Sequence, residues 1–124
     1  MPKPPPPTEY DEQCAFVDWM EIKGLRFTAI PNATYTESWT QKAKNKRMGL
    51  RPGLPDLLVV VPAEKSNTGG AALLFVEMKR QKGGKVEDSQ EAWLATLNQV
   101  KNVEGKICRG FDEATAFVGQ FLAR

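Results

Sequence analysis

The sequence of 124 residues contains no histidine. This absence excludes serine–histidine and cysteine–histidine nucleophile pairs, histidine zinc sites and any imidazole that acts as a general base. Only Cys14 and Cys108 could supply sulfur, and without a CxxC pair we expect reduced side chains that pack as small apolar groups. Any bound metal would therefore be held by oxygen atoms, which favours hard ions such as Mg²⁺ or Mn²⁺.

Long hydrophobic runs are also missing. No apolar stretch approaches the about 20 residues of a membrane-spanning helix, and no secretion-signal pattern opens the chain. We therefore expect a cytoplasmic protein without a membrane partner. The length suits one domain, placed at residues 8–124, whereas the proline-rich residues 1–7 (MPKPPPP) are expected to form an extended, flexible tail.

Local patterns predict an α/β fold in the order α-β-β-β-α-β-α, with helices packed on a small mixed sheet. Thr8 and Asp11 form a capping-box pattern at the start of the first helix, and Gly24 is a natural stop. The run LLVVV predicts a central strand that is buried on both faces, joined by a short turn to an antiparallel partner. Strands are expected at residues 25–30, 57–61, 72–79 and 106–109, and helices at 8–24, at about 88–103 (capped by Asp88 and Glu91) and after the cap Asp112.

Two segments, residues 40–51 and 79–85, carry several basic residues and no acid. They flank the hairpin, which favours a polyanion near the hairpin, although charged loops can simply be solvated. Residues 32–51 are expected to form a functional loop or an irregular short helix. Tyr35 and Trp39 within this stretch suit base stacking or a dimer contact, but we favour Trp39 as an anchor on the core. The candidate polyanion-binding residues are Lys42, Lys44, Lys46, Arg47, Arg51, Arg80, Lys82 and Lys85.

Acidic and basic side chains stand at the ends of the two hairpin strands. Glu77 and Lys79 are two residues apart and face the same way, and Asp56 opens the neighbouring strand close to Glu77. With the backbone carbonyl of Met78, these carboxylates would make an oxygen site for Mg²⁺ or Mn²⁺ that keeps room for phosphate and water. Lys79 would orient or deprotonate the water and stabilise the transition state, whereas an isolated Glu-x-Lys would be a weak surface ion pair.

The stretches GLPDLLVVVP and LLFVEMKR resemble the core of the PD-(D/E)XK nuclease superfamily. Three flanking motifs, EYDEQCAFVDWM, KRMGLRPGLPD and SQEAWLATL, are similar to those of its VRR-NUC family, the virus-type replication-repair nucleases. The resemblance covers the chain from about Glu9 to Leu122. It implies a restriction-endonuclease-like core and a Mg²⁺- or Mn²⁺-dependent, structure-selective DNA endonuclease.

The resemblance also implies roles for individual residues. Asp56, Glu77 and the Met78 carbonyl would bind the metal, and Lys79 would be the catalytic lysine. Glu12 would join the metal directly or through water; it shares the face of Phe16, although it also suits simple helix-start electrostatics. Gln90 would position water, lysine or phosphate, but the physics of the sequence alone favours ordinary helix-start polarity for this residue.

Stand-alone members of this family resemble phage proteins that dimerise and resolve four-way (Holliday) junctions, whereas longer relatives carry the domain inside DNA repair enzymes. We therefore expect a homodimer that acts on branched DNA, because a small domain with one site cannot cut two strands at once. One alternative is a non-catalytic nucleic-acid-binding module that keeps the nuclease fold. Another is a protein-interaction domain that uses Tyr35 and Trp39.

Overall fold

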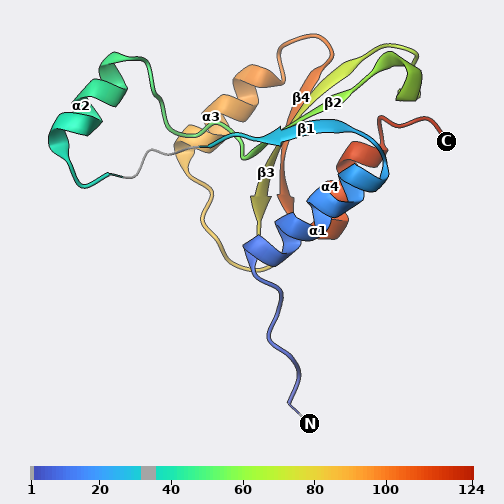
Figure 1. Ribbon diagram of the computed structural model, residues 1–124, viewed down its shortest axis with the longest axis horizontal. Coiled ribbons are helices and arrows are strands. Elements are labelled where there is room, and N and C mark those ends of the chain that lie inside the picture. Colours follow the sequence, from blue (N-terminus) through green and yellow to red (C-terminus); the bar gives the residue numbers. More distant parts are fainter. Residues whose placement is uncertain (1, 32–35) are drawn as a thin grey trace.

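One mixed sheet, in the strand order β1-β2-β3-β4, organises the computed structural model (Figure 1). The structure describes residues 2–31 and 36–124, and in these residues four strands and four α-helices occur, which confirms the α/β class and the four predicted strands but adds one helix to the predicted order. The elements are α1 (Glu9–Ile22), β1 (Arg26–Ala29), α2 (Trp39–Arg47), β2 (Leu57–Val61), the 3₁₀ turn η1 (Ala63–Lys65), β3 (Ala72–Lys79), α3 (Asp88–Leu97), β4 (Val103–Arg109) and α4 (Phe111–Gly119).

The predicted hairpin of β2 and β3 is confirmed, and its register determines where the charged side chains lie. The strands are antiparallel with Leu57 opposite Val76, so Asp56 and Glu77 come level just beyond the last pair. On the outer sides, β1 is antiparallel to β2 and β4 is parallel to β3. The hairpin therefore occupies the centre of the sheet, with β1 beside β2 and β4 beside β3.

The apolar core lies between the sheet and the helices α1 and α4, which pack against each other on one face (Figure 1). Leu57, Val59 and Val61 of β2 point into this core and are fully buried. Leu58 and Val60 point to the opposite face and are only half-buried. The expected burial of this strand on both faces is therefore correct for one face only, because α1 and α4 share the same side.

The first helix has the predicted ends. The Asp11 backbone N–H donates to the Thr8 hydroxyl at 3.1 Å and the Thr8 N–H donates to the Asp11 carboxylate at 3.2 Å, which completes the capping box. Gly24 follows the helix with a positive φ of 68° that favours glycine. Phe16 and Met20 fix the orientation of α1 by burying their side chains completely. The acidic first turn consequently lies beside the end of β3.

The predicted extent of the second helix was wrong. α3 ends at Leu97, and its first turn is capped by Glu87 and Gln90 in place of Asp88 and Glu91. Asn98 reverses the chain, because its side chain accepts from the Gly105 N–H at 2.8 Å and donates to the Gly105 carbonyl at 3.1 Å. This contact spans seven residues, so helical periodicity could not reveal it, and β4 begins three residues earlier than predicted.

The α2 helix was absent from the predicted order, which offered only an irregular short helix as an alternative to a loop. Among the described residues, α2 buries no side chain and stands at the edge of the molecule (Figure 1). Trp39 is 81% exposed, so the expectation that it anchors this segment on the core was wrong. Tyr35 lies outside the described residues.

No helix in residues 2–31 and 36–124 has both the length and the apolar character needed to cross a membrane. Cys108 is fully buried and Cys14 is half-buried, and neither forms a disulfide in the described chain, as the sequence suggested. Asp112 lies in the first turn of α4, but the cap position itself belongs to Gly110, so the prediction was off by two residues.

We predict that Gly53→Ala destabilises the fold more than Gly49→Ala. Both glycines have nearly the same positive φ, 102° and 105°, so each alanine costs about 1–3 kcal/mol in backbone strain. At Gly53 a Cβ would also lie 2.5 Å from the carbonyl oxygen of Ser89, whereas at Gly49 it would meet no described atom within 4 Å. Chemical denaturation should show a further loss of about 1–3 kcal/mol for Gly53→Ala, and equal losses would contradict the close approach of α3.

Candidate metal centre

Three carboxylates from separate parts of the chain meet at the end of the hairpin. They belong to Glu9, the first residue of α1, to Asp56, which precedes β2, and to Glu77 near the end of β3. One oxygen from each lies within 4.8 Å of the others. The register of β2 and β3 brings Asp56 to Glu77, and the packing of α1 on the sheet brings Glu9 to both.

Asp56 is held firmly in this group. One carboxylate oxygen accepts the backbone N–H of Met78 at 2.9 Å, and the Asp56 carbonyl accepts the N–H of Ile30 at 2.7 Å. Its side chain is thus fastened to β3, and its backbone to the end of β1. The Met78 side chain is fully buried in the core, and this backbone contact makes Met78 part of the site.

Glu77 is the buried member of the group and is only partly compensated. The residue is only 3% exposed, and one of its carboxylate oxygens lies 3.8 Å from the ammonium nitrogen of Lys79. Within the described residues, the other oxygen, Oε1, is buried and makes no hydrogen bond. A buried carboxylate oxygen without a partner costs free energy. Among the described residues, no positive group pairs with Oε1 to offset that cost.

The surroundings of Glu77 favour its neutral form. Burial is the largest cause, followed by the charge and hydrogen bond of Asp56, and together they raise the pKa of Glu77 to about 8. Lys79 opposes this rise and Glu9 adds slightly to it. The side chain therefore lies among more negative than positive charge.

A divalent cation fits this donor set. The site offers only oxygen ligands, one of them buried and unpartnered, and its excess negative charge is what Mg²⁺ or Mn²⁺ would neutralise. Glu9, Asp56 and Glu77 are the residues that would hold the ion. Lys79 lies beside them with its side chain 13% exposed, so it can reach a group that enters from solvent.

The structure does not bring Glu12 into this group. Its carboxylate is 5% exposed and accepts hydrogen bonds from the Gln81 side-chain amide at 2.6 Å and from the Phe111 N–H. It therefore joins α1, the loop after β3 and the start of α4. The buried face of the helix pointed to Glu12, but the acids gather at the N-terminal end of α1, where Glu9 immediately follows the cap Thr8.

Gln90 lies near the acids and also serves its own helix. Its side-chain oxygen accepts the Glu87 N–H at 2.9 Å, which is the helix-start role considered for it. The residue also lines a hollow of about 270 Å³ that Asp56 and Glu77 share, between α3 and the loop at Gly53. Both interpretations of Gln90 are thus compatible with its position.

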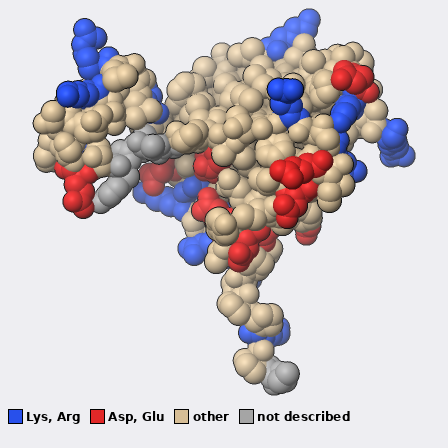
Figure 2. All heavy atoms as spheres, in the orientation of Figure 1, with Lys and Arg blue, Asp and Glu red and all other residues tan. Residues whose placement is uncertain are grey.

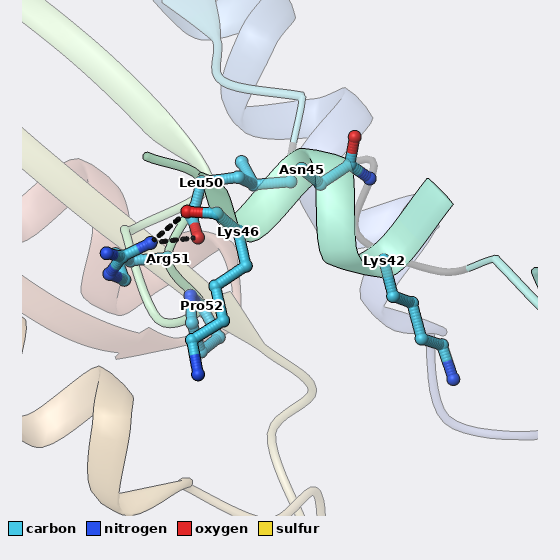
Figure 3. Close-up of a pocket in the computed structure, with 6 residues that line it drawn as sticks. All are labelled: Lys42, Asn45, Lys46, Leu50, Arg51 and Pro52. Carbon is cyan, nitrogen blue, oxygen red and sulfur yellow. Dashed lines mark hydrogen bonds between the residues drawn. The ribbon is translucent and has the colours of Figure 1, made fainter. Parts of the chain in front are cut away.

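The basic residues fall into two groups. Lys42, Lys46 and Arg51 line a hollow of about 350 Å³ below α2, where the Arg51 guanidinium donates to the carbonyls of Lys46 and Leu50 (Figure 3). The other group follows β3, where Lys79, Arg80 and Lys85 line a hollow together with Glu9. Basic and acidic side chains lie near the place where the N-terminal segment leaves the body (Figure 2). Lys44 and Arg47 are exposed elsewhere on α2.

An aspartate, a glutamate and a lysine at adjacent strand ends of a mixed sheet are the arrangement of PD-(D/E)XK-type nucleases. The VRR-NUC domain matches residues 6–112, so the chain belongs to the VRR-NUC family, as the sequence resemblance predicted. This family implies nuclease activity. A solved structure described as a VRR_NUC domain protein shares the fold, with a TM-score of 0.68 and 21% identity over 95% of this chain and 90% of that chain. No curated protein matches the sequence.

We predict that the metal-free protein loses stability as the pH rises from about 4.5 to about 8. The folded state raises the pKa of Glu77 from 4.5 to about 8, so it retains a proton that the unfolded chain releases, and this stabilisation disappears through that window. Glu77→Gln should raise the free energy of unfolding at pH 8 by about 1–3 kcal/mol. Urea denaturation at pH 5 and pH 8 measures the effect, and Glu104→Gln, on an exposed part of β4, is the matched control.

Proposed function

We propose that this protein is a Mg²⁺- or Mn²⁺-dependent, structure-selective DNA endonuclease that cuts branched DNA, such as four-way junctions, as a homodimer. The convergence of three carboxylates beside Lys79 is the observation that carries the proposal. The reaction is hydrolysis: a water oxygen bonds to phosphorus, one phosphorus–oxygen ester bond breaks, and the departing oxygen takes a proton.

The side chains would divide the work in a simple way. Glu9, Asp56, Glu77 and the Met78 carbonyl would hold the ion, which when bound acidifies water and draws negative charge from phosphate. The Lys79 ammonium, next to Glu77, would place a positive charge beside the phosphate as its own negative charge grows. The N–H of Met78 holds the Asp56 carboxylate in place, so this residue would need little reorganisation to bind the ion.

We expect Asp56→Ala and Lys79→Ala each to lower the cleavage rate by about 10²-fold or more. Asp56→Ala removes a proposed ligand of the ion, and Lys79→Ala removes the positive charge beside the reacting phosphate. The measurement is incision of four-way junction, flap and linear duplex DNA with Mg²⁺ or Mn²⁺. Lys101→Ala is the control, because it removes an exposed lysine in the turn before β4, outside the candidate site and both basic groups.

The proposed homodimer is tested by two measurements. Sedimentation gives the mass of the enzyme, and in the incision assay a dimer should make paired cuts in the junction. Variants that cut as fast as the parent would overturn the site. Binding without cleavage or metal dependence would favour the non-catalytic module.

Glu9→Ala and Glu12→Ala should have opposite consequences. Glu9→Ala removes a proposed ligand, so Mn²⁺ affinity should fall about tenfold or more while stability is kept. Glu12→Ala leaves the Phe111 N–H and the Gln81 amide without their acceptor, which should cost about 1–3 kcal/mol of stability. Calorimetric Mn²⁺ titration and urea denaturation of both variants test this assignment. If Glu12→Ala alone weakens Mn²⁺ binding, the assignment of Glu9 is incorrect.

The α2 helix is the proposed contact with the DNA backbone and with the branch point. It carries Lys42, Lys44, Lys46 and Arg47 without an acid, and Arg51 follows it. The Lys42 ammonium lies 4.7 Å from the centre of the exposed Trp39 ring, so a charge and an aromatic face are presented together. Such a pair suits a phosphate next to an unstacked base.

The double variant Lys42→Ala/Lys46→Ala should lower the salt dependence of DNA binding. Each lost phosphate contact reduces the slope of log K against log[salt] by about one, so we expect a reduction of about two. Fluorescence anisotropy with an Asp56→Ala background measures binding without cleavage. Lys101→Ala/Lys106→Ala removes the same charge from exposed positions outside both basic groups and should leave the slope unchanged.

A further inference from the structure

The proline-rich segment before α1 forms a wall of the candidate active site. Glu9 belongs to the acidic group and is the first residue of α1, so the residues just before it cannot lie more than a few ångströms per residue away. Pro6 and Pro7, with Thr8 and Glu9, line one side of a hollow of about 470 Å³. The opposite side consists of Lys79, Arg80, Gly84 and Lys85, which follow β3.

A second hollow lies against the same two prolines. It has a volume of about 440 Å³ and is lined by Pro4, Pro6, Pro7, Arg80, Gln81 and Lys82. Pro6, Pro7 and Arg80 border both hollows, so they form a ridge between them. Figure 1 shows the N-terminal segment leaving the body beside the loop that joins β3 to α3.

The charge of these hollows favours an anion. Lys79, Arg80, Lys82 and Lys85 border them, and Glu9 is the acid among the lining residues. The carboxylate of Glu9 would be neutralised by the ion of the proposed site. Lys85 lies 3.9 Å from Glu87, but this ion pair is exposed and therefore weak, so phosphate can compete for Lys85.

The loop at residues 80–85, which carries the basic side of the two hollows, is held in place by hydrogen bonds from β4. The Arg109 guanidinium donates to the carbonyls of Arg80 at 3.5 Å, Gly83, and Gly84 at 3.3 Å. Gly83 and Gly84 both have positive φ, which lets the loop curl around that guanidinium. The basic side chains of residues 80–85 consequently start from an ordered backbone, as a binding site requires.

The proline wall is apolar, stiff and without N–H donors at the two ring nitrogens. Proline is among the apolar side chains that proteins insert between bases. Each hollow has the size of a small-ligand pocket, which suits a nucleotide unit and is far too small for a duplex.

We propose that the two hollows bind single-stranded nucleotides next to the scissile phosphate, with bases against Pro6 and Pro7 and phosphates toward Arg80, Lys82 and Lys85. The proposal rests on the proposed function, because it places that strand beside Lys79 and Glu9. It assigns a binding role to the segment that the sequence alone presented as a flexible tail. Within branched DNA, the proposal therefore favours substrates with an unpaired strand at the cut, such as a flap, over fully paired four-way junctions.

The test measures the affinity of two fluorescent ligands, oligothymidylate and a hairpin duplex of equal charge. Each is titrated with the Asp56→Ala protein and with the same protein that also carries Pro6→Gly/Pro7→Gly. Loss of the wall should weaken binding of the single strand about tenfold and leave the duplex within twofold. Pro2→Gly/Pro5→Gly is the matched control, because neither residue lines a hollow. Arg80→Gln should weaken single-strand binding as well, and thermal unfolding verifies that all variants fold.

Unchanged single-strand affinity in Pro6→Gly/Pro7→Gly, or equal losses for strand and duplex, would overturn the proposal. So would an equal loss in the Pro2→Gly/Pro5→Gly control. Binding is measured without cleavage, so these outcomes are independent of whether the parent hydrolyses DNA. In the cleaving parent background, the same proline variant should raise KM for flap DNA about tenfold while kcat stays within twofold.

Discussion

The register of β2 against β3 is the constraint on which the rest of the site depends. Leu57 faces Val76, and the Met78 N–H reaches beyond this pair to the Asp56 carboxylate. A slip of one residue would turn Glu77 to the opposite face and break that contact, because side chains alternate along a strand. The buried valines and leucines of both strands oppose such a slip. Packing thus sets the arrangement of the site, although no apolar side chain belongs to the acidic group.

Two other charged residues hold the loops around the hairpin. Glu12 accepts hydrogen bonds from the Gln81 amide and the first N–H of α4, so a carboxylate of α1 caps the helix that packs against it. Arg109 binds three carbonyls of the loop after β3. Both act on the segment that follows Lys79. The lysine therefore sits between a fixed strand and a fixed loop, which limits the reorganisation needed when a substrate enters.

The parts of the fold that sequence predicted well are those set by short-range patterns. The Thr8–Asp11 cap and the β2–β3 hairpin each depend on residues close in sequence, and both are confirmed. The predicted end of the helix near Asn98 was wrong because a contact with Gly105, seven residues on, reverses the chain there. The predicted anchoring of Trp39 was wrong because its side chain stays exposed. The position of Glu9 beside Asp56 and Glu77 was not predicted for a different reason: periodicity finds the packed face of a helix, whereas this acid lies at the helix end.

The division between a rigid site and a detached α2 has a physical consequence for selectivity. A nine-residue helix that buries no side chain among the described residues is marginal in water, so the DNA contact proposed for it would add to its stability. Under that proposal, ordering α2 would cost free energy, which a substrate that also reaches the acids would repay with contacts at both places. A straight duplex offers its backbone along a single line, whereas a branched duplex would offer backbone in more than one direction. Rejection of the wrong shape can therefore arise in α2 while the hairpin remains unchanged.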